Sequence, residues 1–147
     1  FAIGIRALPG ELGRAVLVAY LICRIADTVE DAPGVEPDHK GALLDELLTC
    51  FDGQPAADAY PAHCHAITGE PAHLALVRHA DLVFAHFFTL PPNTRAIVRR
   101  WVTEMAMGMK KFVFLYPHGI RIQTLEEFRE YCYYVAGTVG YMLTDLW

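Results

Sequence analysis

Several features that identify other classes of protein are missing from this sequence of 147 residues. Charged residues make up only 20% of the chain and apolar residues 54%, which excludes a disordered or fibrous protein. No run of about 18 residues is both apolar and free of charge, so we expect no transmembrane helix. The net charge is −5 and basic residues form no stripe, which argues against nucleic acid as a partner.

Cysteine is also scarce, and the four cysteines form no Cys-x-x-Cys pair: they are Cys23, Cys50, Cys64 and Cys132. Three of them stand in apolar helical patterns. We interpret them as reduced, mostly buried thiols of a cytoplasmic protein. The neighbouring His63 and His65, with His73 nearby, have a spacing that suits a tetrahedral zinc site poorly.

The sequence has no internal repeat and no strand-like alternation of useful length, and prolines and glycines divide it into helical segments. We predict a first helix between Pro9-Gly10 and Pro33-Gly34, and a second from Pro37 to Gly53. Residues 53–70 are predicted to be a loop with at most one helical turn. A third helix should begin at Pro71 and end before Pro91-Pro92.

A fourth helix is expected after an N-cap at Asn93 or Thr94. Thr124 and Glu127 form a capping box, so a fifth helix should begin near Leu125. The fold class is therefore all-α. Residues 1–147 are interpreted as a single, incomplete domain, because the chain begins at Phe1 rather than at a methionine.

The first predicted helix carries a narrow polar stripe on an otherwise apolar cylinder. Tyr20, Arg24, Asp27 and Asp31 are spaced four, three and four apart, which places them within roughly 60° of one another. Glu30 flanks them. Because buried charges are costly unless they are paired or bound to a metal, we favour a stripe that lines an internal cavity with a charged ligand. The alternative is a solvated stripe in which Arg24 simply pairs with Asp27.

The carboxylates of the stripe suit a magnesium site. Asp27 and Asp31 lie one turn apart and can share a cation, and Mg²⁺ prefers oxygen ligands. Mg²⁺ usually bridges a few carboxylates to the phosphates of a substrate, so a diphosphate is expected. Arg24 can bind a phosphate oxygen, and with Mg²⁺ it would neutralise a departing diphosphate.

The fifth predicted helix offers an apolar stripe at a spacing of four, formed by Tyr131, Val135, Val139 and Leu143. Gly137 and Gly140 lie in the middle of this helix at a cost in helix propensity, so we expect another helix or a ligand to approach them closely. An ordinary core helix is the alternative, above all for Tyr133, Tyr134 and Tyr141.

Two of these segments resemble the motifs of a known family. Residues 20–31, Tyr-Leu-Ile-Cys-Arg-Ile-Ala-Asp-Thr-Val-Glu-Asp, are similar to the first aspartate-rich motif of the squalene and phytoene synthases. Residues 131–140, Tyr-Cys-Tyr-Tyr-Val-Ala-Gly-Thr-Val-Gly, resemble the tyrosine helix of the same enzymes, and the order and separation of the motifs match. The resemblance extends over the whole chain.

This resemblance implies a fold, a reaction and roles for residues. The fold would be part of the isoprenoid synthase (terpenoid synthase) helical bundle, and the reaction would join two prenyl diphosphates head to head through a cyclopropyl intermediate. Asp27, Glu30 and Asp31 would bind Mg²⁺, and Asp27, Asp31 and Tyr131 would be catalytic. The residues that would bind substrate are Tyr20, Arg24, Phe1, Val135, Val139 and Leu143.

The resemblance also implies what lies outside this chain. The second aspartate-rich motif of the family follows later, so the chain is interpreted as the N-terminal half of a catalytic domain. The sequence of residues 23–31 is most similar to that of bacterial squalene synthases, which use farnesyl diphosphate. NADPH would be a cofactor of the full-length protein. Phytoene or dehydrosqualene synthesis is the alternative. The apolar product would permit peripheral association with the membrane, and no obligate protein partner is inferred.

A non-catalytic helical scaffold or lipid-binding module is the alternative from another class. The apolar helices are compatible with it. The carboxylates and the arginine of the stripe argue against it, because a lipid carrier needs no metal ligands.

Overall fold

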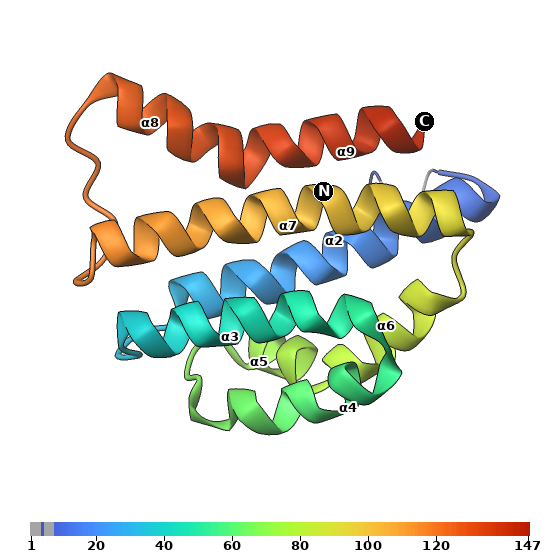
Figure 1. Cartoon of the computed structure of the whole chain (residues 1–147), viewed down its shortest axis with the longest axis horizontal. Helices are drawn as coiled ribbons and strands as arrows, with labels where there is room; N and C mark the ends of the chain where they lie inside the picture. The colour runs from blue at the N-terminus through green and yellow to red at the C-terminus, as the bar shows by residue number, and fades with distance from the viewer. Residues whose placement is uncertain (1–3, 5–7) are drawn as a thin grey trace.

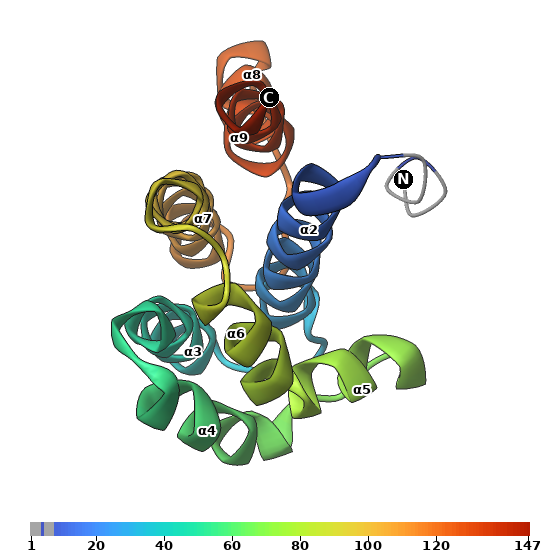
Figure 2. The same ribbon diagram turned by 90° about the vertical axis from the view of Figure 1, so that its right-hand side faces the viewer.

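The computed structural model describes residue 4 and residues 8–147, and every regular element among them is a helix. α2 (Gly10–Asp31) runs through the middle of the bundle (Figures 1 and 2). Five other helices contact it: α3 (Pro37–Thr49), α5 (Pro71–Arg78), α6 (Ala80–Phe88), α7 (Pro92–Leu115) and α9 (Thr138–Leu146). The predicted all-α fold is confirmed for these residues. None of the described helices combines the length and the apolarity needed to cross a membrane.

The central position of α2 follows from its sequence. Apolar side chains surround most of the helix, and Ile22, Ile25, Ala26 and Val29 are completely buried. A helix that is apolar on nearly all sides is stable only when other helices cover it. Thr28 and Glu30 of α2 are consequently buried among packed helices, and Arg24 and Asp27 are partly buried.

Prolines begin several of these helices. Pro37, Pro71 and Pro92 are each the first residue of their helix, where the missing backbone N–H has no intrahelical partner to lose. The predicted N-cap at Asn93 or Thr94 is wrong, because Pro91 occupies the cap position and α7 begins one residue later.

The predicted loop at residues 53–70 is the largest error. The structure has α4 (Gln54–His63) there, between the short 3₁₀ helices η1 (Cys50–Asp52) and η2 (Cys64–Ala66). α4 buries only Ala57 and Tyr60, so its apolar face is too small to produce a visible periodicity. The predicted third helix is also two helices, α5 and α6, because His79 leaves the helical conformation with φ −119° and ψ 26°.

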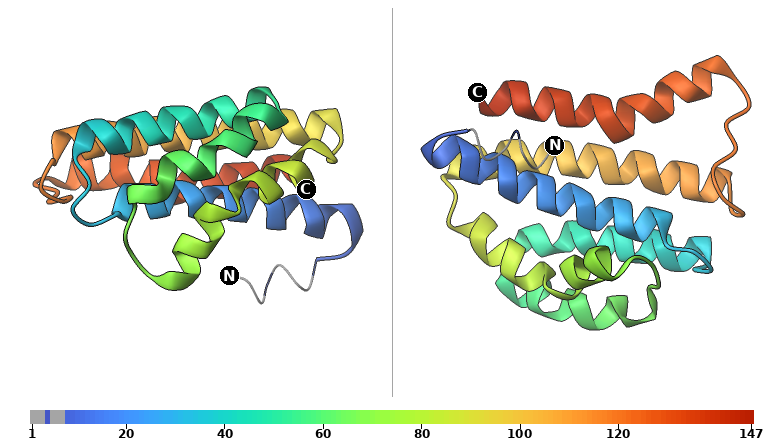
Figure 3. Two further views of the ribbon diagram at one scale, coloured as in Figure 1. Left: turned by 90° about the horizontal axis from the view of Figure 1, so that it is seen from below. Right: turned by 180° about the vertical axis from the view of Figure 1, so that it is seen from behind.

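The C-terminal row consists of α8 (Leu125–Cys132), the π-helical segment η3 (Tyr133–Gly137) and α9, which follow one another along one edge of the bundle (Figure 1). α2 and α7 run side by side beneath this row in the right-hand view of Figure 3. The capping box is confirmed, because Glu127 N donates to Thr124 Oγ1 and Thr124 N donates to Glu127 Oε2. The π-helical segment was not expected.

The close approach of another helix, one of the two possibilities expected at Gly137 and Gly140, is not found. Among the described residues nothing lies within 4 Å of a β-carbon built at Gly140, and the nearest neighbours of Gly137 belong to its own helical row. The close contact between this row and α7 occurs at Gly108 of α7, against the ring of Tyr134. The row therefore packs on a glycine of its partner helix and not through its own.

Candidate active site

Three residues of the predicted polar stripe line one cavity of about 410 Å³, which we call the first cavity. Tyr20, Arg24 and Asp27 of α2 lie on one of its walls. The facing walls are apolar and include Met105 of α7 together with Val135, Val139 and Leu143 of the C-terminal row. This volume is typical of small-molecule sites. Apolar walls with an arginine and a carboxylate suit a ligand that joins a hydrocarbon chain to an anionic group.

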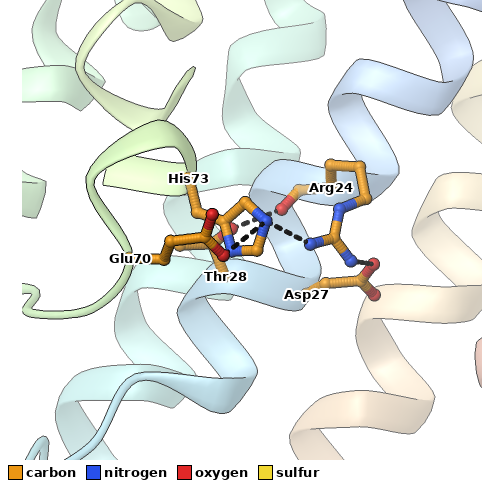
Figure 4. A network of polar contacts seen from close by, with 5 residues as sticks. All are labelled: Arg24, Asp27, Thr28, Glu70 and His73. Atoms are coloured by element: carbon orange, nitrogen blue, oxygen red, sulfur yellow. Dashed lines mark hydrogen bonds and ion pairs between the residues drawn. The ribbon is translucent and has the colours of Figure 1, made fainter. Parts of the chain in front are cut away.

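Arg24 is held in place by contacts on two sides. Its Nη1 donates to Asp27 Oδ2 at 2.9 Å, and its Nη2 lies 2.9 Å from His73 Nε2 of α5 (Figure 4). Thr28 Oγ1 donates to the Arg24 carbonyl oxygen at 2.7 Å. The pairing of Arg24 with Asp27 that the alternative interpretation expected is present, but the pair is half-buried and faces the first cavity.

A second cavity of about 390 Å³ contains the remaining acidic residues of the motif. Glu30 and Asp31 of α2 line it together with Lys40 of α3, Tyr116 and Tyr131. Lys40 Nζ donates to the backbone oxygen of Glu30 at 2.5 Å, at the C-terminal end of α2. A lysine at this position also complements the negative end of the helix dipole.

Glu30 is the most unusual group of the site. Its side chain is buried, and Oε1 has no hydrogen-bond partner among the described residues. Burial and the carboxylates of Asp31 and Asp27 together raise the pKa of Glu30 to about 7, against the opposing effects of hydrogen bonding from Tyr131 and the charge of Lys40. A carboxyl group in this state would gain from a cation nearby.

Asp27 and Tyr131 are perturbed for related reasons. Burial raises the pKa of Asp27 and the charge of Asp31 adds to this, whereas Arg24 lowers it. Burial also raises the pKa of Tyr131, and the charge of Glu30 contributes in the same direction. The phenol of Tyr131 therefore keeps its proton at neutral pH and can donate a hydrogen bond.

The donor set fits Mg²⁺ only if a ligand supplies further oxygens. No three His, Cys, Asp or Glu side chains in the described part of the chain converge closely enough to hold a metal ion by themselves. The unpartnered Glu30 Oε1 and the adjacent carboxylates of Asp27 and Asp31 nevertheless offer the hard oxygen donors that Mg²⁺ prefers. Mg²⁺ typically completes such partial sites with water and substrate phosphates.

The structure brings most of the predicted site residues together, but it divides them between two cavities. Tyr20, Arg24 and Asp27 line the first cavity, whereas Glu30 and Tyr131 line the second. Asp31 is exposed to solvent and also lines the second cavity. Asp27 and Asp31, expected to share one site, thus face different cavities. Phe1 lies outside the described residues.

Three polar residues lie next to the site but were not predicted to belong to it: Lys40, His73 and Tyr116. His73 stands 49 residues from Arg24 and Lys40 ten residues from Glu30. No pattern in the sequence connects either pair, because the contacts arise only when α3 and α5 pack on α2. For Lys40 and His73, the one sequence feature that could have indicated a role was their position in the first turns of a helix that begins with proline.

Comparison with known proteins identifies the family. Residues 1–147 match the family profile described as squalene/phytoene synthase over the entire chain. The chain belongs to the squalene/phytoene synthase family. This confirms the resemblance drawn from residues 20–31 and 131–140, and it excludes a helical scaffold unrelated to these transferases.

Several squalene synthases are similar to this family member. The chain is 31% identical to the squalene synthase of Schizosaccharomyces pombe and 33% identical to that of Eremothecium gossypii, over 99% of its length in both cases. It spans 31% and 32% of the length of those relatives. Among solved structures, TcSQS in complex with the ligand BPH1237 superposes with a TM-score of 0.81 at 27% identity, over 99% of this chain and 39% of that one.

Proposed function

We propose that the complete protein containing this chain joins two molecules of farnesyl diphosphate head to head, through presqualene diphosphate, to give squalene. Membership in the squalene/phytoene synthase family supports a prenyl diphosphate substrate. The observation that carries the proposal is the first cavity, in which Arg24 and Asp27 face the apolar side chains of Val135, Val139 and Leu143. A prenyl chain fits such apolar walls, and a diphosphate fits the arginine.

The residues of this chain would have distinct roles in binding the substrate and in holding a proton near the reacting carbons. Tyr20 and Arg24 would bind the diphosphate, with the guanidinium donating to its oxygens. Tyr131, whose phenol stays protonated, would hold its proton on the phenol oxygen and donate a hydrogen bond beside the reacting carbons. Val135, Val139 and Leu143 would exclude water from the prenyl chain, which protects a cationic intermediate from hydrolysis.

We propose that Asp27, Glu30 and Asp31 hold Mg²⁺ together with the diphosphate oxygens. When bound, Mg²⁺ would neutralise the charge that develops on the departing diphosphate. The buried, unpartnered Oε1 of Glu30 supports this assignment. Reduction to squalene further needs a hydride donor, for which we propose NADPH, and we assign no residue of this chain to it.

The test is product analysis with the complete protein. It should convert farnesyl diphosphate to squalene in the presence of Mg²⁺ and NADPH, detected by gas chromatography with mass spectrometry. Addition of EDTA should abolish the product, and excess Mg²⁺ should restore it. A parallel reaction with geranylgeranyl diphosphate tests phytoene formation, and omission of NADPH tests dehydrosqualene. Formation of phytoene as the main product, or of dehydrosqualene as the main product with NADPH present, would overturn the squalene assignment, and absence of any prenyl product would overturn the proposed reaction.

A further inference from the structure

Arg24 separates the first cavity from a smaller one of about 120 Å³, which we call the third cavity. Glu70 and His73 of the α5 region line the third cavity together with Thr28. Among the described residues that line the first cavity, Arg24 is present and His73 is not. His73 therefore contacts the guanidinium on the side of the third cavity and not of the first, which a ligand would occupy. Figure 4 shows the contact between the two side chains.

The contact between Arg24 and His73 fixes the protonation of the histidine. A guanidinium group can only donate hydrogen bonds, so Nε2 of His73 must accept the bond from Arg24 Nη2 at 2.9 Å. The ring is consequently neutral, with its proton on Nδ1. Glu70 Oε2 lies 3.5 Å from the same Nε2 atom, but its side chain is 63% exposed and water screens its charge.

The two partners of Arg24 differ in what they do to its charge. Asp27 forms an ion pair that offsets the positive charge of the guanidinium, and it competes with any anionic ligand. His73 is a neutral acceptor, so it restrains the flexible arginine side chain and leaves its charge available. A restrained guanidinium loses less conformational freedom when a diphosphate binds.

We propose that His73 is a positioning residue that acts through Arg24, by holding the guanidinium toward the first cavity as a neutral hydrogen-bond acceptor. This inference rests on the proposed function, because it assumes that Arg24 binds a diphosphate. It requires the hydrogen-bond acceptor and the neutrality of the side chain at position 73, and both can be varied separately.

Three variants of the complete protein separate these requirements. His73→Ala removes the acceptor, and kcat/KM for the prenyl diphosphate should fall about tenfold, as expected for loss of a hydrogen bond to a charged group. His73→Gln places a neutral carbonyl acceptor near the position of Nε2 and should restore kcat/KM to within about threefold of the wild type. His73→Glu keeps an acceptor but offsets the charge of Arg24, and it should be at least as impaired as His73→Ala.

Inorganic pyrophosphate provides a second measurement, because it carries the diphosphate without the prenyl chain. Its inhibition constant should rise about tenfold in His73→Ala and recover in His73→Gln, in parallel with kcat/KM. The matched control is His86→Ala, which makes the same change at an exposed histidine of α6 and should behave as the wild type. Thermal unfolding of every variant shows whether it is folded.

Several results would overturn the inference. Wild-type kinetics in His73→Ala, full activity in His73→Glu, or a pyrophosphate inhibition constant that does not change would each contradict it. Equal loss of activity in His73→Ala and His73→Gln, with both proteins folded, would show that the ring shape matters and the acceptor does not. A wild-type protein that forms no prenyl product and binds no pyrophosphate would instead refute the proposed function, and this inference with it.

Discussion

Gly108 of α7 lies directly against the aromatic ring of Tyr134: a β-carbon at Gly108 would stand 2.0 Å from Tyr134 Cγ. No side chain fits at this position while the ring stays where it is. The glycine therefore permits the π-helical segment to pack closely on α7, and it fixes the distance between the C-terminal row and the rest of the bundle.

Substitution of this glycine should destabilise the chain. Gly108→Ala forces the Tyr134 ring to move, and it should lower the free energy of unfolding by about 1–3 kcal/mol, as overpacking generally does. Denaturant unfolding of the complete protein measures this. Gly140→Ala is the matched control, because among the described residues nothing approaches its β-carbon position within 4 Å. It should be neutral or stabilising by about 0.5–1 kcal/mol, and equal effects of the two substitutions would contradict the packing argument.

Asp27→Asn should strongly reduce turnover with little loss of stability. The substitution keeps the shape of the side chain and removes a charge from a cluster of carboxylates whose burial raises the pKa of Asp27. It also removes a proposed ligand of Mg²⁺, so kcat of the complete protein should fall about 100-fold or more. Asp38→Asn, at an exposed aspartate of α3, should leave kcat unchanged. Turnover of Asp27→Asn near that of the wild type at saturating Mg²⁺ would contradict the assignment.

Glu30 should make the stability of the metal-free protein depend on pH. Its pKa is about 7 in the folded protein, against an ordinary pKa of 4.5 for glutamate, so the folded state binds a proton more tightly than the unfolded state. Stability from this group is therefore present below about pH 4.5 and is lost as the pH rises through about 7. Glu30→Gln should remove this loss and raise the unfolding midpoint at pH 8 in EDTA. A midpoint difference between variant and wild type that does not change with pH would contradict it.

The cysteines should differ in their reactivity with alkylating reagents. Burial raises the pKa of Cys23 and Cys50 to about 12 and that of Cys64 to about 11, and all three thiols are buried. Cys132 is partly exposed. Iodoacetamide at pH 8 should therefore label Cys132 first, as mass spectrometry of digested protein can show. Unfolding in denaturant should equalise the four sites, and early labelling of Cys50 or Cys64 in the native protein would contradict the packing around them.

Much of the fold could be predicted from the residues that begin and end helices and from the apolar faces of the helices. Pro9-Gly10, Pro37, Pro71 and the capping box at Thr124 gave correct helix starts, because each acts through local backbone chemistry. α4 was not predicted, because it buries only two side chains and therefore shows no clear apolar periodicity in the sequence. The break at His79 was also missed, since nothing in the local sequence requires it.

The site was predictable to the extent that it lies on single helices. The spacing of Tyr20, Arg24 and Asp27 placed them on one wall of one cavity, as expected. The contact of His73 with Arg24 depends on how α5 packs on α2, which no spacing within one helix can indicate. The burial of Glu30 likewise depends on the packing of helices that are distant in sequence.

The π-helical segment at Tyr133–Gly137 places one wide turn in the middle of the C-terminal row. Each turn of a π-helix contains more residues than a turn of an α-helix, so one extra residue is accommodated there without breaking the row. Tyr131, before the segment, faces the second cavity, whereas Val135 within it and Val139 after it both face the first. Deletion of a single residue such as Ala136 would convert the wide turn into an ordinary α-helical turn, and the helical parts on either side would keep nearly the same orientation. Deletion of Tyr141 within α9 would instead turn Leu143 by about 100° and direct it away from the first cavity.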